Sequence, residues 1–305
     1  MYRNFLDIKD ISTDELNKIL DLALKIKATP EDYYSVLAHK KMILLLEKNS
    51  TRTRVSFELG MKELGGHCCV LNSSNTQLSR GESIEDTARV FNEMADCVVI
   101  RTFGHDRLLK LAEYFTNGCV INALTDKSHP CQIMADIMTF MEVNKTSIKG
   151  KNVAWFGDVN NMLISWLEAS EKLGFEINIC CPECLFEKLS KLTTAEQRKW
   201  KYKLFTNKVE ASKGCDIITT DTWVSMGEDK SKSKIFLDGD FIVDEKVMQN
   251  ANEGAIFLHC LPAYRGYEVA SEVIDNPVYS KVVFQEAGNR LHIQKAILMY
   301  CFGLV

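Results

Sequence analysis

Short apolar runs alternate with longer amphipathic stretches along the whole chain. The runs that we expect to be strands are residues 42–46, 68–71, 97–100, 120–122, 153–156, 175–180, 215–220 and 255–258. Apolar residues spaced by three and four predict helices at residues 14–27, 55–66, 83–94, 108–115, 133–143, 162–173, 183–200 and 289–302. Such an alternation is typical of parallel sheets that carry helices on both faces.

The strand–helix rhythm restarts near the middle of the chain, which indicates two domains. The sequence therefore predicts an α/β fold with two domains, each a parallel β-sheet flanked by helices, joined by interdomain helices. We expect a first domain at residues 1–132, a second at 133–287, and a C-terminal helix, 288–305, that packs back on the first domain. A chain of 305 residues is long enough for two domains of ordinary size.

The polar residues that follow the expected strands are the candidates for a site, because ligands of open α/β sheets bind beyond the carboxyl ends of the strands. The densest group is Ser50-Thr51-Arg52-Thr53-Arg54, between a strand and a helix. A helix N-terminus attracts anions, hydroxyl groups can donate to phosphate oxygens, and arginine adds a fixed charge. The alternative is a capped surface helix with solvated arginines. The concentration of hydroxyls and arginines after a buried strand favours an anion site.

The later loops divide into two chemical kinds. Loops of the first half are cationic or donate hydrogen bonds, and they contain Gln77, Arg80, Arg101, His129 and Gln132. Loops of the second half offer a carboxylate, amides and a thiol, and they contain Asn160, Asn161, Asp221, Ser225, Met226, His259 and Cys260. Each residue alone has an ordinary structural interpretation, such as a solvated arginine or a buried cysteine. Together they predict an anion held by the first half and an ammonium group held by the second.

Composition narrows the classes of function. The hydrophobic fraction is 46%, the charged fraction 26% and the net charge -4, so a nucleic-acid partner is not expected. No apolar run reaches transmembrane length and the N-terminus has no signal pattern, so we expect no membrane partner. Eleven cysteines then indicate free thiols in a reducing, cytoplasmic compartment. Cys181 and Cys184 have CxxC spacing but no second ligand pair, so no metal site is expected.

Five motifs make the chain resemble the ornithine carbamoyltransferases over nearly its whole length. They follow the order of that family and are Ser50-Thr51-Arg52-Thr53-Arg54, Arg101-Thr102-Phe103-Gly104-His105, His129-Pro130-Cys131-Gln132, Asp221-Thr222-Trp223-Val224-Ser225-Met226-Gly227 and His259-Cys260-Leu261-Pro262. The first motif is shared with aspartate carbamoyltransferases. The S-M-G and H-C-L-P runs are instead similar to the ornithine branch.

The resemblance implies a transferase that moves the carbamoyl group of carbamoyl phosphate to the δ-amine of L-ornithine. The products would be L-citrulline and phosphate, in arginine biosynthesis or arginine catabolism, with no metal and no organic cofactor. It also implies a homotrimer or a multiple of trimers, with active sites at subunit interfaces. Two alternatives are another amine acceptor such as putrescine, and a non-catalytic paralogue. A dinucleotide-binding protein is a poorer match, because Trp155-Phe156-Gly157-Asp158 lacks the G-x-G-x-x-G spacing.

The same resemblance assigns roles to individual residues. Carbamoyl phosphate would be bound by Ser50, Thr51, Arg52, Thr53, Gln77, Arg101, His129, Gln132, Cys260, Leu261 and Arg290. Ornithine would be bound by Asn161, Asp221, Ser225 and Met226. The catalytic residues would be Arg101 and His129, which stabilise oxyanion charge, and Cys260, which as a thiolate could hold or accept a proton. Gly81 departs from the pattern, because some relatives have there a lysine that reaches a neighbouring subunit's site.

Overall fold

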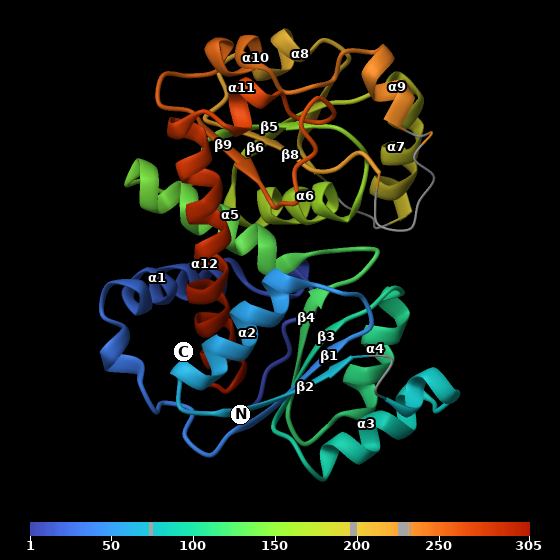
Figure 1. Ribbon diagram of the computed structural model, residues 1–305, viewed down its shortest axis with the longest axis vertical. Helices are drawn as coiled ribbons and strands as arrows, with labels where there is room; N and C mark the ends of the chain where they lie inside the picture. Colours follow the sequence, from blue (N-terminus) through green and yellow to red (C-terminus); the bar gives the residue numbers. More distant parts are fainter. Residues whose placement is uncertain (73–75, 196–199, 225–230, 232) are drawn as a thin grey trace. The chain divides into compact units, whose positions relative to one another are not determined.

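A computed structural model describes residues 1–72, 76–195, 200–224, 231 and 233–305 of the chain. It divides into two compact units (Figure 1): unit 1 comprises residues 1–138 and 288–305, and unit 2 comprises residues 139–287. Both boundaries fall inside helices, α5 (Pro130–Asn144) and α12 (Pro277–Cys301). Each unit contains a parallel sheet with helices around it, so the predicted fold class is confirmed.

Unit 1 is built on a four-stranded parallel sheet with the order β2-β1-β3-β4. Its strands are β1 (Lys41–Leu46), β2 (His67–Asn72), β3 (Cys97–Arg101) and β4 (Cys119–Leu124). Its helices, apart from α5 and α12, are α1 (Thr13–Ala28), α2 (Thr51–Glu63), α3 (Ile84–Asn92) and α4 (His105–Tyr114), with 3-10 turns η1 (Ile8–Asp10), η2 (Pro30–Tyr33) and η4 (Gln77–Arg80). Each predicted strand of the first half is therefore confirmed.

The two faces of this sheet bury alternate residues of the same strands. On one face Ile43, Val98 and Val120, which lie side by side in register, form a cluster with apolar residues of α3 and α4. Figure 1 shows α3 and α4 together on that side, and α2 on the other. This packing leaves the strand ends, rather than the strand faces, to carry polar residues.

Unit 2 contains a five-stranded parallel sheet with the order β7-β6-β5-β8-β9. Its strands are β5 (Asn152–Phe156), β6 (Glu176–Cys180), β7 (Tyr202–Phe205), β8 (Ile217–Thr220) and β9 (Ile256–His259). Its helices are α6 (Asn161–Leu173), α7 (Phe186–Ala195), α8 (Lys208–Ser212), α9 (Ser233–Asp238), α10 (Glu245–Asn250) and α11 (Ser271–Ile274), with the 3-10 turn η5 (Glu183–Leu185).

One apolar cluster of unit 2 lies on the sheet face that α8, α10 and α11 cover. Ala154, Ile218 and Phe257 from three neighbouring strands join one apolar cluster with residues of these helices. Figure 1 shows α6 on the opposite side of the sheet. Within the described ranges, no helix combines the length and the apolar character that crossing a membrane requires.

The predicted helix 183–200 is wrong in its extent. The segment starts as the turn η5, α7 is described from Phe186 to Ala195, and Trp200 is not helical. Residues 196–199 lie outside the described residues. The final helix begins earlier than predicted, at Pro277. The prediction also missed β7, because an edge strand buries little on its outer side and here alternates half-buried positions with the exposed Lys203. The short helices α8 to α11 gave too few turns for a periodic signal.

Candidate functional site

The register of each sheet aligns the strand ends from which the candidate residues follow. In unit 1, Leu46 of β1 pairs with Arg101 of β3, which pairs with Leu124 of β4. In unit 2, Phe156 of β5 pairs with Thr220 of β8, which pairs with His259 of β9. Because the strands are parallel, the loops after them leave from the same edge of each sheet. Each unit therefore gathers one set of candidate residues.

The first turn of α2 (Thr51–Glu63) follows the segment where the sequence predicts an anion site, which we call the cradle. Ser50 is the N-cap residue: its backbone is extended, and its side chain accepts the Thr53 N–H at 3.2 Å. The helix N-terminus adds positive dipole charge at this position. Arg52 is half-buried, whereas Arg54 is exposed and pairs with Glu58 at 3.4 Å. The structure therefore separates the two arginines of the motif, because Arg52 is partly buried and Arg54 is exposed.

Arg290 links three elements of unit 1 at this cradle. Its guanidinium is only 2% exposed and donates to the Gln132 side-chain oxygen at 2.5 Å and to Thr53 Oγ1 at 3.4 Å. Gln132 in turn donates to Asp136 Oδ1 at 2.8 Å. Thr53 belongs to α2, Gln132 to α5 and Arg290 to α12, so residues 237 positions apart in sequence meet here. A buried guanidinium with donors beside it suits a phosphate or carboxylate.

His129 lies within the same cationic group, directly before the first residue of α5. Burial lowers the pKa of its imidazole well below the ordinary value, and the positive charges of Arg290, Arg101 and Arg52 lower it further. The ring is therefore neutral near pH 7. A neutral imidazole can still donate a hydrogen bond to a polarised carbonyl oxygen. Arg101 can donate to such an oxygen too, and it adds a full positive charge.

This shifted pKa predicts a pH-dependent stability. Because the folded-state pKa of His129 lies below its unfolded value of about 6.5, the unfolded chain binds more protons, and stability falls as pH drops below about 6.5. In His129→Asn the free energy of unfolding should depend less steeply on pH below about 6.5, by up to about 1.4 kcal/mol per pH unit. Urea unfolding between pH 5 and 8 measures the slope. His67→Asn, at an exposed side chain, is the control. Equal slopes for wild type and His129→Asn would contradict the assignment.

Arg101 begins a turn that a separate ion pair holds. Glu47, which follows β1, accepts the Thr102 hydroxyl and pairs with Arg107 at 2.7 Å. The Glu47 N–H also donates to the Arg101 carbonyl at 2.9 Å. Glu47 and Arg107 were not predicted to take part, because in the sequence they resemble ordinary surface charges. They keep the Arg101 turn beside the end of β1.

In unit 2 the predicted residues Asp221 and Cys260 are in contact. The Cys260 thiol donates to Asp221 Oδ1 at 3.2 Å, and the Thr222 N–H donates to the same oxygen at 2.7 Å. Asn160 donates to Asp221 Oδ2 at 3.1 Å while its own oxygen caps α6. Asp221 and Cys260 are both half-buried. The result is a carboxylate held in place on both oxygens and suited to an ammonium group.

Asn160 was not assigned a role from the sequence. In the sequence it belongs to the polar residues of the second-half loops, and it precedes an apolar helical run, which is typical of an N-cap. Asn161, which was assigned to ornithine, is the first residue of α6, and its carbonyl accepts the Ser165 hydroxyl at 3.0 Å. Asn160 thus contributes an amide that contacts Asp221.

Some predicted residues are not brought into these two sets. Gln77 lies on η4 with an exposed side chain, and Thr51 is also exposed. Ser225 and Met226 lie outside the described residues. Gly81 ends η4 with φ 96°, a left-handed backbone that favours glycine, so a lysine here would be strained although a Cβ would meet nothing within 4 Å.

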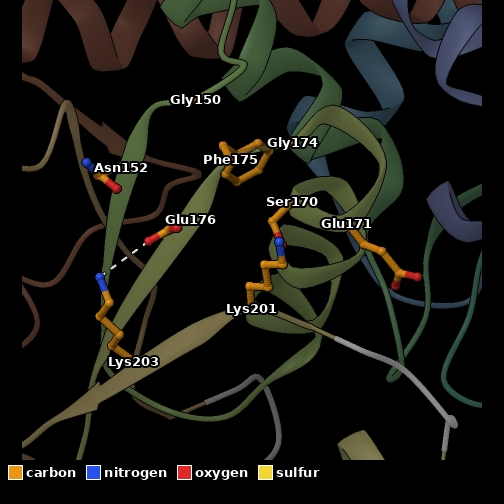
Figure 2. Close-up of a pocket in the computed structure, with 9 residues that line it drawn as sticks. All are labelled: Gly150, Asn152, Ser170, Glu171, Gly174, Phe175, Glu176, Lys201 and Lys203. Atoms are coloured by element: carbon orange, nitrogen blue, oxygen red, sulfur yellow. Dashed lines mark hydrogen bonds and ion pairs between the residues drawn. The ribbon is translucent and has the colours of Figure 1, made fainter.

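The pocket in Figure 2 belongs to neither set. It lies in unit 2, has a volume of about 580 Å³ and is lined by Gly150, Asn152, Ser170, Glu171, Gly174, Phe175, Glu176, Lys201 and Lys203. Its strand residues lie at the amino ends of β5, β6 and β7, opposite the edge where ligands of such sheets bind. Glu176 and Lys203 pair across it at 3.3 Å. In the described part of the chain, no cluster of three or more histidine, cysteine or acidic residues could hold a metal ion.

Comparisons with known proteins match both units. Residues 3–142 match the carbamoyl-P binding domain of aspartate/ornithine carbamoyltransferases, and residues 149–301 match the Asp/Orn binding domain. The ornithine carbamoyltransferase of Nitrobacter winogradskyi is 44% identical over 304 residues, 99% of this chain and 97% of the relative. The anabolic ornithine carbamoyltransferase of Campylobacter jejuni has a TM-score of 0.87 at 41% identity, covering 99% and 100% of the two chains. That of Pyrococcus furiosus has a TM-score of 0.87 at 40% identity, covering 97% and 96%.

Proposed function

Because this chain belongs to the aspartate/ornithine carbamoyltransferase family, we propose that it transfers the carbamoyl group of carbamoyl phosphate to the δ-amine of L-ornithine. The products are L-citrulline and phosphate. The observation that carries this proposal is the division of charge: unit 1 gathers Arg52, Arg101 and Arg290 around a neutral histidine, and unit 2 holds Asp221 beside Cys260. The first set suits a phosphorylated electrophile and the second suits an amine.

Unit 1 would bind the electrophile and stabilise the leaving group. The phosphate would take hydrogen bonds from the first turn of α2 and charge from Arg52, where growing negative charge is met by fixed positive charge. Arg101 and His129 would donate to the carbamoyl oxygen as it gains charge in the tetrahedral intermediate. Arg290, already fixed by Gln132 and Thr53, costs little reorganisation when the anion binds.

Unit 2 would bind and orient the nucleophile. The δ-amine of ornithine must lose its proton before it attacks, and in water it is mostly protonated at neutral pH. Asp221 would pair with the α-ammonium group of ornithine, and the δ-amine would lie near Cys260. The Cys260 thiol contacts the Asp221 carboxylate. The amine nitrogen then forms the new bond to the carbamoyl carbon, the bond to phosphate breaks, and the released proton passes to a nearby base. No step of this reaction needs a metal or an organic cofactor.

The remaining assignments extend the same proposal. Carbamoyl phosphate would be bound by Ser50, Thr51, Arg52, Thr53, Gln77, Arg101, His129, Gln132, Cys260, Leu261 and Arg290, and ornithine by Asn161, Asp221, Ser225 and Met226. A cytoplasmic homotrimer, or a multiple of it, is the expected assembly, and light scattering coupled to gel filtration tests its mass. All eleven cysteines are free thiols, which supports a reducing compartment.

A citrulline assay tests the function directly. The purified chain, given carbamoyl phosphate and L-ornithine, should form citrulline and phosphate in equal amounts. Putrescine and L-aspartate are the comparison acceptors. Phosphate release with putrescine but not with ornithine would show that putrescine, and not ornithine, is the acceptor. Absence of product with every acceptor, although carbamoyl phosphate binds, would favour a non-catalytic paralogue.

Replacement of Cys260 tests whether catalysis is covalent. We expect Cys260→Ala to lower kcat by roughly 10- to 100-fold without abolishing it, because the thiol assists proton handling while the amine remains the nucleophile. Steady-state citrulline formation measures the change. Cys184→Ala, at an exposed thiol, is the control. A carbamoyl adduct on Cys260, trapped by acid quench and found by mass spectrometry, would contradict the noncovalent reaction.

A further inference from the structure

The turn after β9 contains Cys260 and, directly after it, a residue in an uncommon backbone conformation. Leu261, directly after Cys260, has φ 56°, in the left-handed region that residues with a side chain rarely occupy. Such a residue persists only where its surroundings fix it. The contacts of the neighbouring His259 provide that restraint.

His259 is buried and bonded on both ring nitrogens. The Leu261 N–H donates to His259 Nδ1 at 2.9 Å, so this nitrogen must carry a lone pair rather than a proton. The ring proton therefore lies on Nε2, which faces Glu268 Oε1 at 3.2 Å and donates to it. The tautomer that can hold Leu261 is the one that Glu268 selects.

Glu268 anchors this arrangement from the far side of the turn. It is 1% exposed, and the same Oε1 also accepts the Tyr264 N–H at 2.5 Å. The backbone N–H of His259 donates to Glu286 Oε2 at 2.9 Å. Side chains therefore hold the turn at residues 259, 261 and 264, and Cys260 lies inside the fixed segment.

We propose that Glu268 is a positioning residue, which acts through His259 and Leu261 to hold the Cys260 thiol against Asp221. The contribution of Glu268 to turnover rests on the proposed function. Its role in placing the Cys260 thiol does not depend on that function. The role depends on the position of an acceptor oxygen and not on negative charge. Glutamine places a carbonyl oxygen at the same distance from the backbone, whereas aspartate keeps the charge but withdraws the carboxylate by one methylene.

Glu268→Gln and Glu268→Asp together test the proposal. We expect Glu268→Gln to keep kcat near the wild-type value, and Glu268→Asp to lower it on the order of 100-fold, as displacement of a reacting group by about 1 Å does. The KM for carbamoyl phosphate should change much less than kcat, because most of its assigned contacts lie in unit 1. A purely stabilising role would lower the melting temperature without this split in kcat.

The reactivity of Cys260 gives a readout that needs no substrate. We expect Glu268→Asp to speed alkylation of Cys260 by iodoacetamide, read peptide by peptide in a mass spectrometer, because the thiol is released from Asp221. Cys184, exposed in the same unit, is the internal reference. Asp275→Asn, which breaks the exposed pair with Arg265 near the same turn, is the matched control and should leave Cys260 unchanged.

The outcomes separate this proposal from the proposed function. Faster alkylation of Cys260 in Glu268→Asp but not in Glu268→Gln supports the positioning role, even if no acceptor gives citrulline. Equal alkylation rates in all three proteins would overturn it. A Glu268→Gln variant that is more impaired than Glu268→Asp would also overturn it, since the charge would then matter more than the geometry.

Discussion

Replacement of Arg52 by alanine is expected to abolish measurable binding of carbamoyl phosphate while unit 1 stays folded. Arg52 stands in the first turn of α2, and its charge is among those that lower the pKa of His129, so it belongs to the cationic group. A charged hydrogen bond contributes about 1.5–3 kcal/mol, so losing a two-bond contact weakens binding roughly 100-fold or more. Titration calorimetry with carbamoyl phosphate or phosphonoacetate measures this loss.

Arg54 supplies a matched control for that experiment. It lies two residues further along the same helix, is exposed, and pairs with Glu58 one turn away. An exposed pair of this kind contributes little to stability, so Arg54→Ala should bind the anion nearly as wild type does. Tight binding by Arg52→Ala, or an equal loss in both variants, would show that the cradle has been assigned to the wrong residues.

Asp221→Asn is the second change with a large expected effect, and it should act on the other substrate. Asparagine keeps the shape of the side chain but removes the negative charge with which the α-ammonium group of ornithine would pair. Breaking a charge pair costs about 2–5 kcal/mol, so the KM for ornithine should rise roughly 30-fold or more. Binding of carbamoyl phosphate, whose assigned contacts lie mostly in unit 1, should change little. Initial rates across both substrate concentrations, with calorimetry for carbamoyl phosphate, separate the two effects.

The same strand offers the control. Asp216 precedes β8 and pairs with Lys151 at 3.6 Å, whereas Asp221 follows β8. Asp216→Asn therefore removes a carboxylate from the opposite end of the sheet, where ligands do not bind. Loss of ornithine affinity in both variants alike would point to a general weakening of unit 2 instead of a lost ammonium contact.

Much of the candidate site could be predicted because it lies at strand ends. Arg101, His129, Asp221 and Cys260 each follow a short apolar run in the sequence, and parallel topology brings such positions to one edge. Arg290 had no such signal, since it lies inside a long helix and meets Thr53 from 237 residues away. It was assigned through the resemblance alone. Glu47 and Glu268 were missed, because their partners are fixed by folded loops.

By itself, the sequence determined the α/β class, the strands of both sheets except the edge strand β7, and the chemical kinds of the two half-sites. These follow from local patterns: buried strands need continuous apolar runs, and an anion needs arginines and hydroxyls close together. The tertiary structure alone decided which charges are buried together. It separated Arg52 from Arg54, joined Arg290 to Gln132, and placed the Cys260 thiol on Asp221. Burial, the pKa shift of His129 and the tautomer of His259 arise from contacts between residues distant along the chain or across an irregular turn, and no local pattern encodes them.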